Sequence, residues 1–287
     1  MWKRFSVFIR ILKKTSWERL SNAVLLLCSY YYSRLSGKSN VWAFPIALSV
    51  EPTTACNLQC PQCPSGLRSF NRPTGNLKLD EFIKWIRPLQ SKIWMMSFYF
   101  QGEPFIHPKI CEAIRYAHSA GIYTMSSTNA HFLDDQQSLE IVRSGLDQLI
   151  ISIDGSDQDV YEQYRKGGRL EQVLKGTENL LKARQSLKAK NPWIIWQFIV
   201  FRTNEHQMND VRQMAKQSGV DEILFKTAQI YENSSSADLI PEHSLYSRYT
   251  KDRKGKMQIK NKLLNHCWRL WRAPVITWDG RVVPCCF

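Results

Sequence analysis

The 287-residue sequence lacks several features that would place it in common protein classes. Its most apolar early stretch, Ala23 to Cys28 followed by Tyr30 to Tyr32, is about half the roughly 20 residues that a bilayer-spanning helix needs. The basic, Tyr-rich start offers no small-residue cleavage site, so we expect no cleavable signal peptide. The chain also lacks both familiar Gly-rich phosphate-binding loops and any internal repeat, which argues against mononucleotide- or dinucleotide-binding folds and repeat arrays.

What is present suits a globular protein with a sizeable core. Hydrophobic residues make up 44% of the chain and aromatic residues 12%, which argues against disorder. The length fits one large α/β domain, or a domain of about 200 residues with appendages. The 39 Lys and Arg residues exceed the 25 Asp and Glu residues, for a net charge of +14. This excess favours a phosphate- or carboxylate-rich partner or an anionic membrane, although a solvated basic surface explains it equally well.

The most informative stretch is a triplet of cysteines, Cys56, Cys60 and Cys63, separated by three and then two residues. Their thiolates can converge on a soft-metal centre, and no fourth cysteine or histidine lies nearby. Since a closed zinc site needs four protein ligands, the triplet predicts a metal centre with one open position. The alternatives are a reduced surface loop or a zinc site with a remote fourth ligand. Cysteines grouped in this way indicate metal binding in a reducing, cytoplasmic compartment rather than disulfides.

Residues 1–44 differ from the rest of the chain. Trp2, Phe5, Phe8, Ile9 and Leu12 recur at helical spacing among basic residues, which predicts a basic amphipathic helix. A peripheral membrane contact through residues 1–40 is one interpretation, and a helical extension packed on the following domain is the other. We expect Cys28 to be a buried small hydrophobe.

From residue 45 to 230 the pattern predicts six strand–helix units. Helix-period stretches separate six strand candidates, and Pro88, Gly121, Gly145 and Gly219 end helices. This alternation predicts an α/β fold with a parallel sheet, namely a partial (β/α)6 barrel whose chemistry lies at the carboxyl ends of the strands. The strand candidates are Ile46–Val50, Trp94–Phe100, Ile122–Ser127, Leu149–Ile153, Ile194–Phe201 and Glu222–Lys226.

Polar residues follow several of these strands. The cysteine triplet comes after the first strand, Gly102 and Glu103 after the second, Asn129 after the third, and Ser152 and Asp154 at the end of the fourth. Turn chemistry alone also favours Gly, Asn and Asp at such places. Their coincidence with a metal loop predicts one functional mouth.

On these residues the chain resembles the radical S-adenosylmethionine (radical SAM) superfamily, over roughly Pro45 to Gln229. The resemblance rests on the Cys56-x-x-x-Cys60-x-x-Cys63 motif, on Gly102-Glu103-Pro104 and on the six-unit barrel. It implies that the three cysteines hold a [4Fe–4S] cluster whose free iron chelates the amino and carboxylate groups of S-adenosylmethionine. It further implies reductive cleavage to methionine and a 5′-deoxyadenosyl radical, which abstracts hydrogen from a substrate carbon.

The same resemblance implies roles for individual residues. Gly102 and Glu103 match the segment that binds the methionine amino group, although the family often has another glycine where this chain has Gln101. Ser152 and Asp154 resemble positions that contact the ribose hydroxyls or the methionine carboxylate. The remaining candidates are Arg165, as a carboxylate partner or a solvated cation, and Asn129 and Gln197, which are expected to point into the same mouth.

The last segment, residues 231–287, starts with a Ser-rich linker and contains Cys267, Cys285 and Cys286. Val275 to Val283 predicts a β-hairpin with a two-residue turn at Asp279-Gly280. The pattern resembles the start of a SPASM/twitch extension, in which such cysteines begin an auxiliary iron–sulfur cluster; the end at Phe287 would leave that cluster incomplete. The alternative is a hairpin with buried thiols. Cys111 falls in a helix stripe and is expected in the core.

The resemblance therefore predicts a radical SAM enzyme that oxidatively modifies a peptide or a sugar-derived small molecule. Its expected partners are a flavodoxin- or ferredoxin-type electron donor and that substrate. The alternative is a metal-stabilised, non-catalytic module that binds nucleic acid or an anionic membrane surface. Nucleic acid is the weaker partner, because basic residues interleaved with aromatic ones lie mainly in residues 1–40, outside the metal region.

Overall fold

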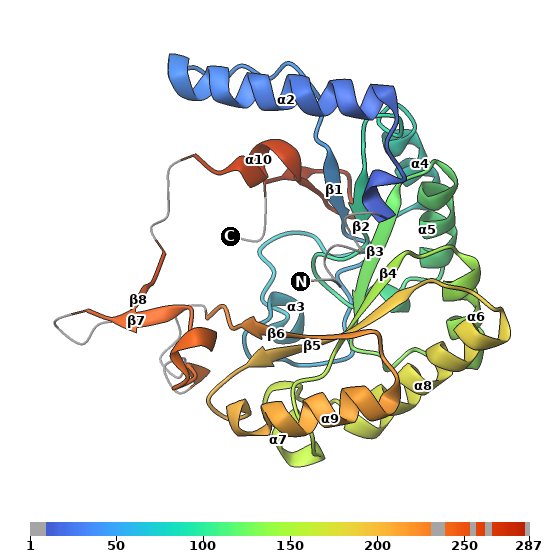
Figure 1. The fold of residues 1–287 in the computed structure, drawn as a ribbon, viewed down its shortest axis with the longest axis vertical. Helices are drawn as coiled ribbons and strands as arrows, with labels where there is room; N and C mark the ends of the chain where they lie inside the picture. The colour runs from blue at the N-terminus through green and yellow to red at the C-terminus, as the bar shows by residue number, and fades with distance from the viewer. Residues whose placement is uncertain (1–9, 231–238, 253–256, 262–265, 285–287) are drawn as a thin grey trace.

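The computed structural model describes residues 10–230, 239–252, 257–261 and 266–284. A parallel sheet forms its centre, with strands β1 to β6 side by side in chain order. These strands are β1 (Ala47–Val50), β2 (Met95–Ser97), β3 (Tyr123–Thr128), β4 (Gln148–Ser152), β5 (Trp193–Val200) and β6 (Glu222–Thr227). All six predicted strands are present, and the sheet curves without closing, as a partial barrel does (Figure 1).

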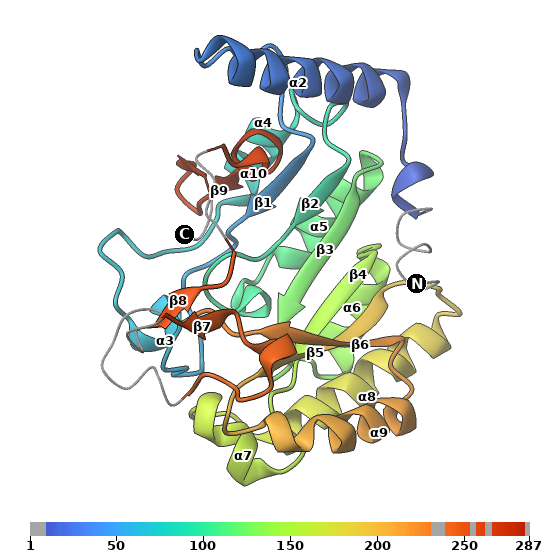
Figure 2. The ribbon, with the colours of Figure 1, turned by 60° about the vertical axis from the view of Figure 1, so that its left-hand side comes forward.

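Helices cover the outer face of this curved sheet, as Figures 1 and 2 show. The helices predicted from the sequence present the expected apolar stripes, and Gly145 and Gly219 follow helices in the left-handed conformation. The connecting helices are α4 (Leu79–Ile86), α5 (Ile110–Ser119), α6 (Asp135–Arg143), α7 (Gln158–Tyr164), α8 (Leu170–Ser186) and α9 (Met208–Ser218). The short α7, which carries Tyr164 and leads into Arg165, was not predicted from the sequence.

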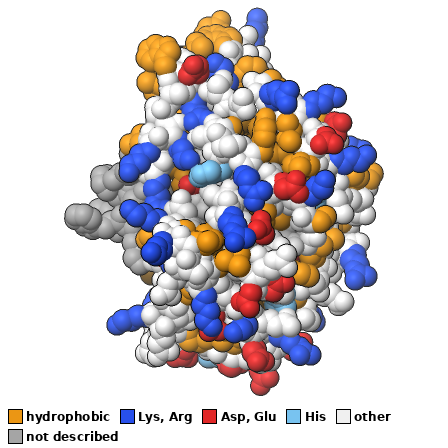
Figure 3. Space-filling view, turned by 90° about the vertical axis from the view of Figure 1, so that its right-hand side faces the viewer, with side chains coloured by type: hydrophobic (Ala, Val, Ile, Leu, Met, Phe, Trp, Pro, Cys, Tyr) orange, Lys and Arg blue, Asp and Glu red, His pale blue; other side chains and the backbone are white. Residues whose placement is uncertain are grey.

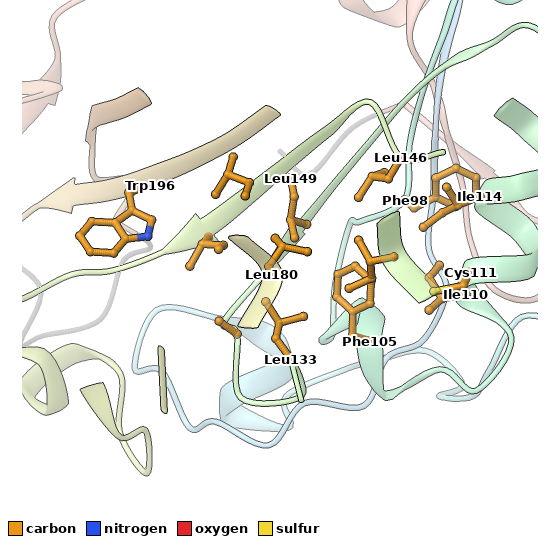
Figure 4. Packing of buried hydrophobic residues seen from close by; sticks show 14 of the residues in the cluster. Phe98, Phe105, Ile110, Cys111, Ile114, Leu133, Leu146, Leu149, Leu180 and Trp196 are labelled. Carbon is orange, nitrogen blue, oxygen red and sulfur yellow. The ribbon is translucent and has the colours of Figure 1, made fainter. Parts of the chain in front are cut away.

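The core lies between the sheet and these helices. Leu149 and Trp196 of the sheet and Ile114 and Leu180 of the helices are all fully buried (Figure 4). Cys111 belongs to this cluster on α5, so its predicted place in the core is confirmed. This packing fixes the strands, and therefore the loops at their carboxyl ends.

A helix that precedes the barrel, α2 (Trp17–Ser36), crosses the amino-terminal end of the sheet (Figure 2). Ser16 caps its first turn, and Gly37 ends it in the left-handed conformation. The apolar run noted in the sequence is the middle of this one helix. The expectation for Cys28 is wrong: its side chain is exposed, because it lies on the side of α2 that faces away from the barrel.

The C-terminal part adds a hairpin to the open edge of the sheet. Strand β9 (Val275–Ile276) pairs parallel with β1, and β10 (Val282–Val283) pairs antiparallel with β9. The hairpin is confirmed, but its predicted two-residue turn is wrong. Thr277 and Arg281 still bond to each other, so the loop has three residues, with Gly280 in the left-handed conformation.

The hairpin is held at this edge by side chains. The Trp278 ring packs where a Cβ on Gly75 would lie, and the Trp85 ring packs where a Cβ on Gly280 would lie. Glu51 forms an ion pair with Arg72 and accepts a hydrogen bond from the Trp278 backbone N–H. The other described elements are α3 (Pro64–Leu67), α10 (Trp268–Arg272), β7 (Tyr249–Lys251), β8 (Met257–Ile259) and the 3₁₀ turns at Pro104–Ile106, Glu205–Gln207 and Ser244–Tyr246.

Candidate functional site

A pocket of about 550 Å³ opens at the carboxyl ends of the strands. Cys56, Cys60 and Cys63 line it together, from the loop after β1. Segments from all six parallel strands meet there, as the strand–helix pattern predicted. The other predicted site residues on the pocket wall are Gly102, Glu103, Asn129, Ser152, Arg165 and Gln197.

The cysteine loop is held in place by contacts with distant segments. Asn57, next to Cys56, accepts a hydrogen bond of 2.7 Å from the Asn129 amide at the end of β3. The Gln59 backbone N–H donates to the carbonyl of Lys166, beyond α7. These two anchors keep the loop over the strand ends before any ligand binds, which is the preorganisation that a metal site needs.

Helix α3 follows Cys63 directly and packs against Cys60. A Cβ placed on Gly66 would lie 2.5 Å from the Cys60 backbone nitrogen, so only glycine fits there. Ser65, in α3, donates a hydrogen bond to the Gln101 side chain and accepts one from the Gly102 backbone N–H. The Gln101 side-chain amide oxygen, Oε1, also lies 3.9 Å from the Cys63 sulfur. Gln101, at the position where the resemblance led us to expect a glycine, thus takes part in the loop's hydrogen bonding.

The Gly102-Glu103 segment is pressed against the start of the cysteine loop. Gly102 has a φ of 75°, and a Cβ there would lie 2.3 Å from the Thr53 carbonyl oxygen. The Glu103 backbone N–H donates to the Ala55 carbonyl at 2.7 Å. These contacts explain why glycine precedes glutamate at this point.

The Glu103 carboxylate connects β2 to β3. It accepts hydrogen bonds from the Thr128 hydroxyl and the Asn129 backbone N–H, each at 2.7 Å, and from the Phe105 backbone N–H at 3.3 Å. Burial raises the pKa of Glu103 to about 7, although these donors oppose the shift. Its proposed contact with an amino group remains a prediction, and its observed role is to position the end of β3.

Arg165 brings a fixed positive charge to the cysteines. Its Nε donates to Asp154 at 2.6 Å, and its Nη1 lies 3.9 Å from the Cys60 sulfur. Although burial opposes it, the nearby Asp154 and Cys60 raise the pKa of Arg165 above its ordinary value, so the guanidinium stays charged. Asp154 is fully buried behind Arg165 and also accepts from the Ile199 backbone N–H. It therefore orients Arg165 instead of lining the pocket.

The remaining walls were not identified from the sequence. Tyr164 and Phe201 stack with ring centroids 4.2 Å apart and form an apolar side. Lys226, Gln229 and Arg248 line the side formed by β6 and the segment before β7. No local motif marks these residues, because their positions depend on where the chain returns after β6.

The donor set fits an iron–sulfur cluster. Burial raises the pKa of the Cys56 thiol to about 11 and also raises that of Cys60, so these thiols become thiolates only beside a cationic centre. Within the described ranges, no three cysteine, histidine or acidic side chains converge as closely as one ion requires. Thiolates that bind separate irons of one cluster need no such convergence.

Residues 50–194 match the family model of the Radical SAM superfamily. The chain belongs to that superfamily. Its cofactors are those of the superfamily, a [4Fe–4S] cluster and S-adenosylmethionine, and the motif that implied them lies within the matched range.

Two curated relatives illustrate the breadth of this family. The chain is 27% identical over 236 residues to an AdoMet-dependent heme synthase of Methanosarcina barkeri, covering 79% of this chain and 64% of the relative. It is 27% identical over 198 residues to a PqqA peptide cyclase of Bradyrhizobium diazoefficiens, covering 67% and 49%. The chain thus spans about half to two thirds of the length of these relatives.

Among solved structures, the fold resembles Streptococcus suis SuiB bound to S-adenosylmethionine. The TM-score is 0.64 at 13% identity, and the match covers 88% of this chain and 63% of that one. This likeness supports the partial-barrel fold. The helices of the described residues are too short or too polar to cross a membrane.

Proposed function

We propose that this protein is a radical SAM enzyme that cleaves S-adenosylmethionine reductively and uses the resulting 5′-deoxyadenosyl radical to abstract hydrogen from a substrate carbon. The observation that carries this proposal is the shared pocket of Cys56, Cys60, Cys63, Gly102 and Arg165. The bound cofactors would supply the radical chemistry. The protein's own residues would hold the cluster, place a fixed cation beside it and enclose the reacting centre.

In this proposal most predicted residues keep their roles, whereas Asp154 orients Arg165 and does not contact the cofactor. Gly102 and Glu103 would receive the amino group of S-adenosylmethionine, and Arg165 its carboxylate. Ser152 would contact the ribose hydroxyls or the carboxylate, and Asn129 and Gln197, which line the same pocket, would face the bound cofactor. The fixed charge of Arg165 supports this assignment, because a buried guanidinium pairs well with a carboxylate.

The substrate that we propose is a peptide or a sugar-derived molecule with an acidic group, modified by net oxidation. Lys226 and Arg248 line the pocket on the side formed by β6, and their charge suits a carboxylate or a phosphate. The similarity to the PqqA peptide cyclase favours a peptide. An external flavodoxin- or ferredoxin-type protein would provide the electron in the cytoplasm.

We also propose the predicted domain division, with an N-terminal extension in residues 1–44, the barrel in 45–230 and the start of an auxiliary cluster domain in 231–287. Cys267 is exposed at the start of α10, just ahead of the hairpin, which suits a ligand. Cys285 and Cys286, the other proposed ligands, lie outside the described residues. Iron in excess of about four atoms per chain, lost in Cys267→Ala, would support this auxiliary cluster.

The test of the main proposal is the release of 5′-deoxyadenosine. Anaerobically reconstituted wild type, given dithionite and S-adenosylmethionine, should release it, measured by chromatography. Cys56→Ala should lower both iron content and release by more than about 100-fold, because a ligand loss exceeds the effect of an outer contact. Cys28→Ala, which changes an exposed cysteine on α2, is the matched control and should behave like wild type.

Two outcomes would contradict the proposal. One is wild type that binds zinc tightly and releases no 5′-deoxyadenosine. The other is an equal loss in Cys56→Ala and Cys28→Ala, which would disconnect the reaction from the pocket. Membership of the superfamily does not favour the alternative, a non-catalytic module, but the first of these outcomes would revive it.

A further inference from the structure

Helix α2 is oriented with polar side chains toward the barrel and apolar ones toward solvent. On its inner side the buried residues are Arg19, Asn22, Leu26, Ser29 and Tyr30. Its opposite side carries what we call the outer face of α2. The exposed residues of that face are Trp17, Leu20, Val24, Leu25, Leu27, Cys28, Tyr31, Tyr32 and Leu35.

The inner side is fixed to the protein by hydrogen bonds to the backbone. The Arg19 guanidinium donates to the carbonyls of Gln90, Ala120 and Gly121, in the loops that lead into β2 and β3. Asn22 bonds both the N–H and the carbonyl of Phe44. Turning α2 to bury its apolar side would break these bonds and leave a buried guanidinium unpaired. The outer face is therefore held outward.

The outer face is broad and contains few charges. Trp17 is 78% exposed at one end and Leu35 is 88% exposed at the other. At about 100° per residue, its apolar positions cover about 160° of the helix circumference. A helix pair buries a narrower seam of two positions per heptad, so a single partner helix would leave much of this face in water. A flat apolar phase would cover all of it.

The residues around this face fit the surface of an anionic bilayer. The exposed charged side chains nearest to it in sequence are Lys13, Arg34 and Lys38, against the single acidic Glu18. Trp42 stacks with Tyr32 and is exposed beside the helix, as the aromatic residues of interfacial helices are. Figure 3 shows hydrophobic side chains at the end of the molecule where Figure 1 places α2, with Lys and Arg around them.

A second element supports the inner side of α2. Helix α10 packs there, with Tyr30 in contact with the rings of Trp268 and Trp271. This contact adds to those that hold the outer face of α2 outward.

We propose that the outer face of α2 lies on an anionic phospholipid bilayer, with the helix axis in the plane of the membrane. Since α2 is bonded to the loops before β2 and β3, the bilayer would lie at the amino ends of the strands. The pocket opens at the opposite, carboxyl ends, so the mouth would face the aqueous phase. This inference concerns where the enzyme sits and does not depend on the proposed reaction.

The experiment is flotation of the reconstituted full chain with phospholipid vesicles. Vesicles containing about 30% phosphatidylglycerol should carry the wild type at least about 10-fold better than pure phosphatidylcholine vesicles. Trp17→Glu combined with Leu35→Glu should lower that binding at least about 10-fold, because both ends of the apolar face become charged. Leu245→Glu, at a residue 80% exposed elsewhere, is the matched control and should float like wild type.

A probe on the face gives a second readout. Cys28 is exposed on the outer face, so an environment-sensitive dye attached there should shift its emission to shorter wavelength when phosphatidylglycerol vesicles are added. Cys28→Ser, which leaves only other cysteines to react, should show no such shift. Wild type that does not float, or a double variant that floats like wild type, would overturn the proposal. The proposal would also be overturned if light scattering showed that the wild type is a dimer and the double variant a monomer, since a second copy would then cover the outer face.

Discussion

The mouth of the barrel and helix α2 are both held by buried polar side chains, but they expose different surfaces. In both regions buried polar side chains hold backbone segments together: Glu103 joins β2 to β3 at the mouth, and Arg19 joins α2 to the loops at the other end. At the mouth the bonded segments surround a pocket. At α2 they leave an apolar surface facing outward. The difference shows that buried polar contacts fix where a segment lies, whereas the side chains that the segment then exposes indicate what it does.

The largest effect should come from changing how closely the mouth is packed. In Gly66→Ala the new Cβ would collide with the Cys60 backbone, so α3 must move away from the cysteine loop. We expect iron affinity to fall by about 10- to 100-fold, as when contacts that support metal ligands are lost. Titration of the cluster-free protein with iron measures this affinity. Leu67→Ala, at the exposed neighbouring position, should bind iron like wild type, and normal affinity in Gly66→Ala would show that α3 is not needed there.

The next effect separates the two sides of α2. Arg19→Met removes the bonds to four carbonyls, one of them within the same segment at Lys14, but keeps a long side chain, so the free energy of unfolding should fall by about 2–4 kcal/mol. Urea unfolding measures this loss. Binding to anionic vesicles should persist, because the outer face is unchanged. The Trp17→Glu, Leu35→Glu variant should show the reverse, with ordinary stability and weak binding. If the two variants gave the same pattern, the two sides of the helix would not have separate roles.

The smallest effect concerns the charge of Glu103. Burial raises its pKa to about 7 in the folded protein, above the ordinary 4.5. The folded state therefore binds this proton more tightly, and its stabilising contribution is complete below pH 4.5 and is lost as the pH rises to about 7. The loss amounts to at most about 3 kcal/mol.

Glu103→Gln lacks this titration, so comparing it with wild type isolates the effect. Without cofactors, the difference in unfolding free energy between wild type and Glu103→Gln should shift against wild type across that pH range, as urea unfolding can measure. A difference that stays constant, or that moves in favour of wild type, would mean that the three hydrogen-bond donors outweigh burial and keep the carboxylate charged.

The sequence predicted the barrel well because its signals are local. Strand and helix periods identified all six strands, and the rule that parallel strands carry function at their carboxyl ends brought Cys56, Glu103 and Ser152 to one pocket. Asp154 was predicted to touch the cofactor, and the structure places it behind Arg165. That distinction depends on which of two bonded groups lies nearer the cavity, which spacing along the chain does not encode.

Long-range contacts account for what the sequence did not show. Cys28 was expected inside because a lone cysteine usually packs as a small hydrophobe. In α2 the buried side is instead occupied by Arg19 and Asn22, through bonds to distant carbonyls and to Phe44. The pairing of β9 with β1 was also not predicted, since a strand of two residues carries no partner information. Lys226 and Arg248 reach the pocket only through the path of the chain after β6.

The central claim is that the pocket beside Cys56, Cys60 and Cys63 holds a cluster with an iron open to S-adenosylmethionine. The most direct test is the electron paramagnetic resonance spectrum of the dithionite-reduced protein, recorded before and after S-adenosylmethionine is added. The structure predicts a reduced [4Fe–4S] signal whose shape changes on addition in wild type. A signal that S-adenosylmethionine leaves unchanged would contradict the claim, because the cofactor would then not reach the iron.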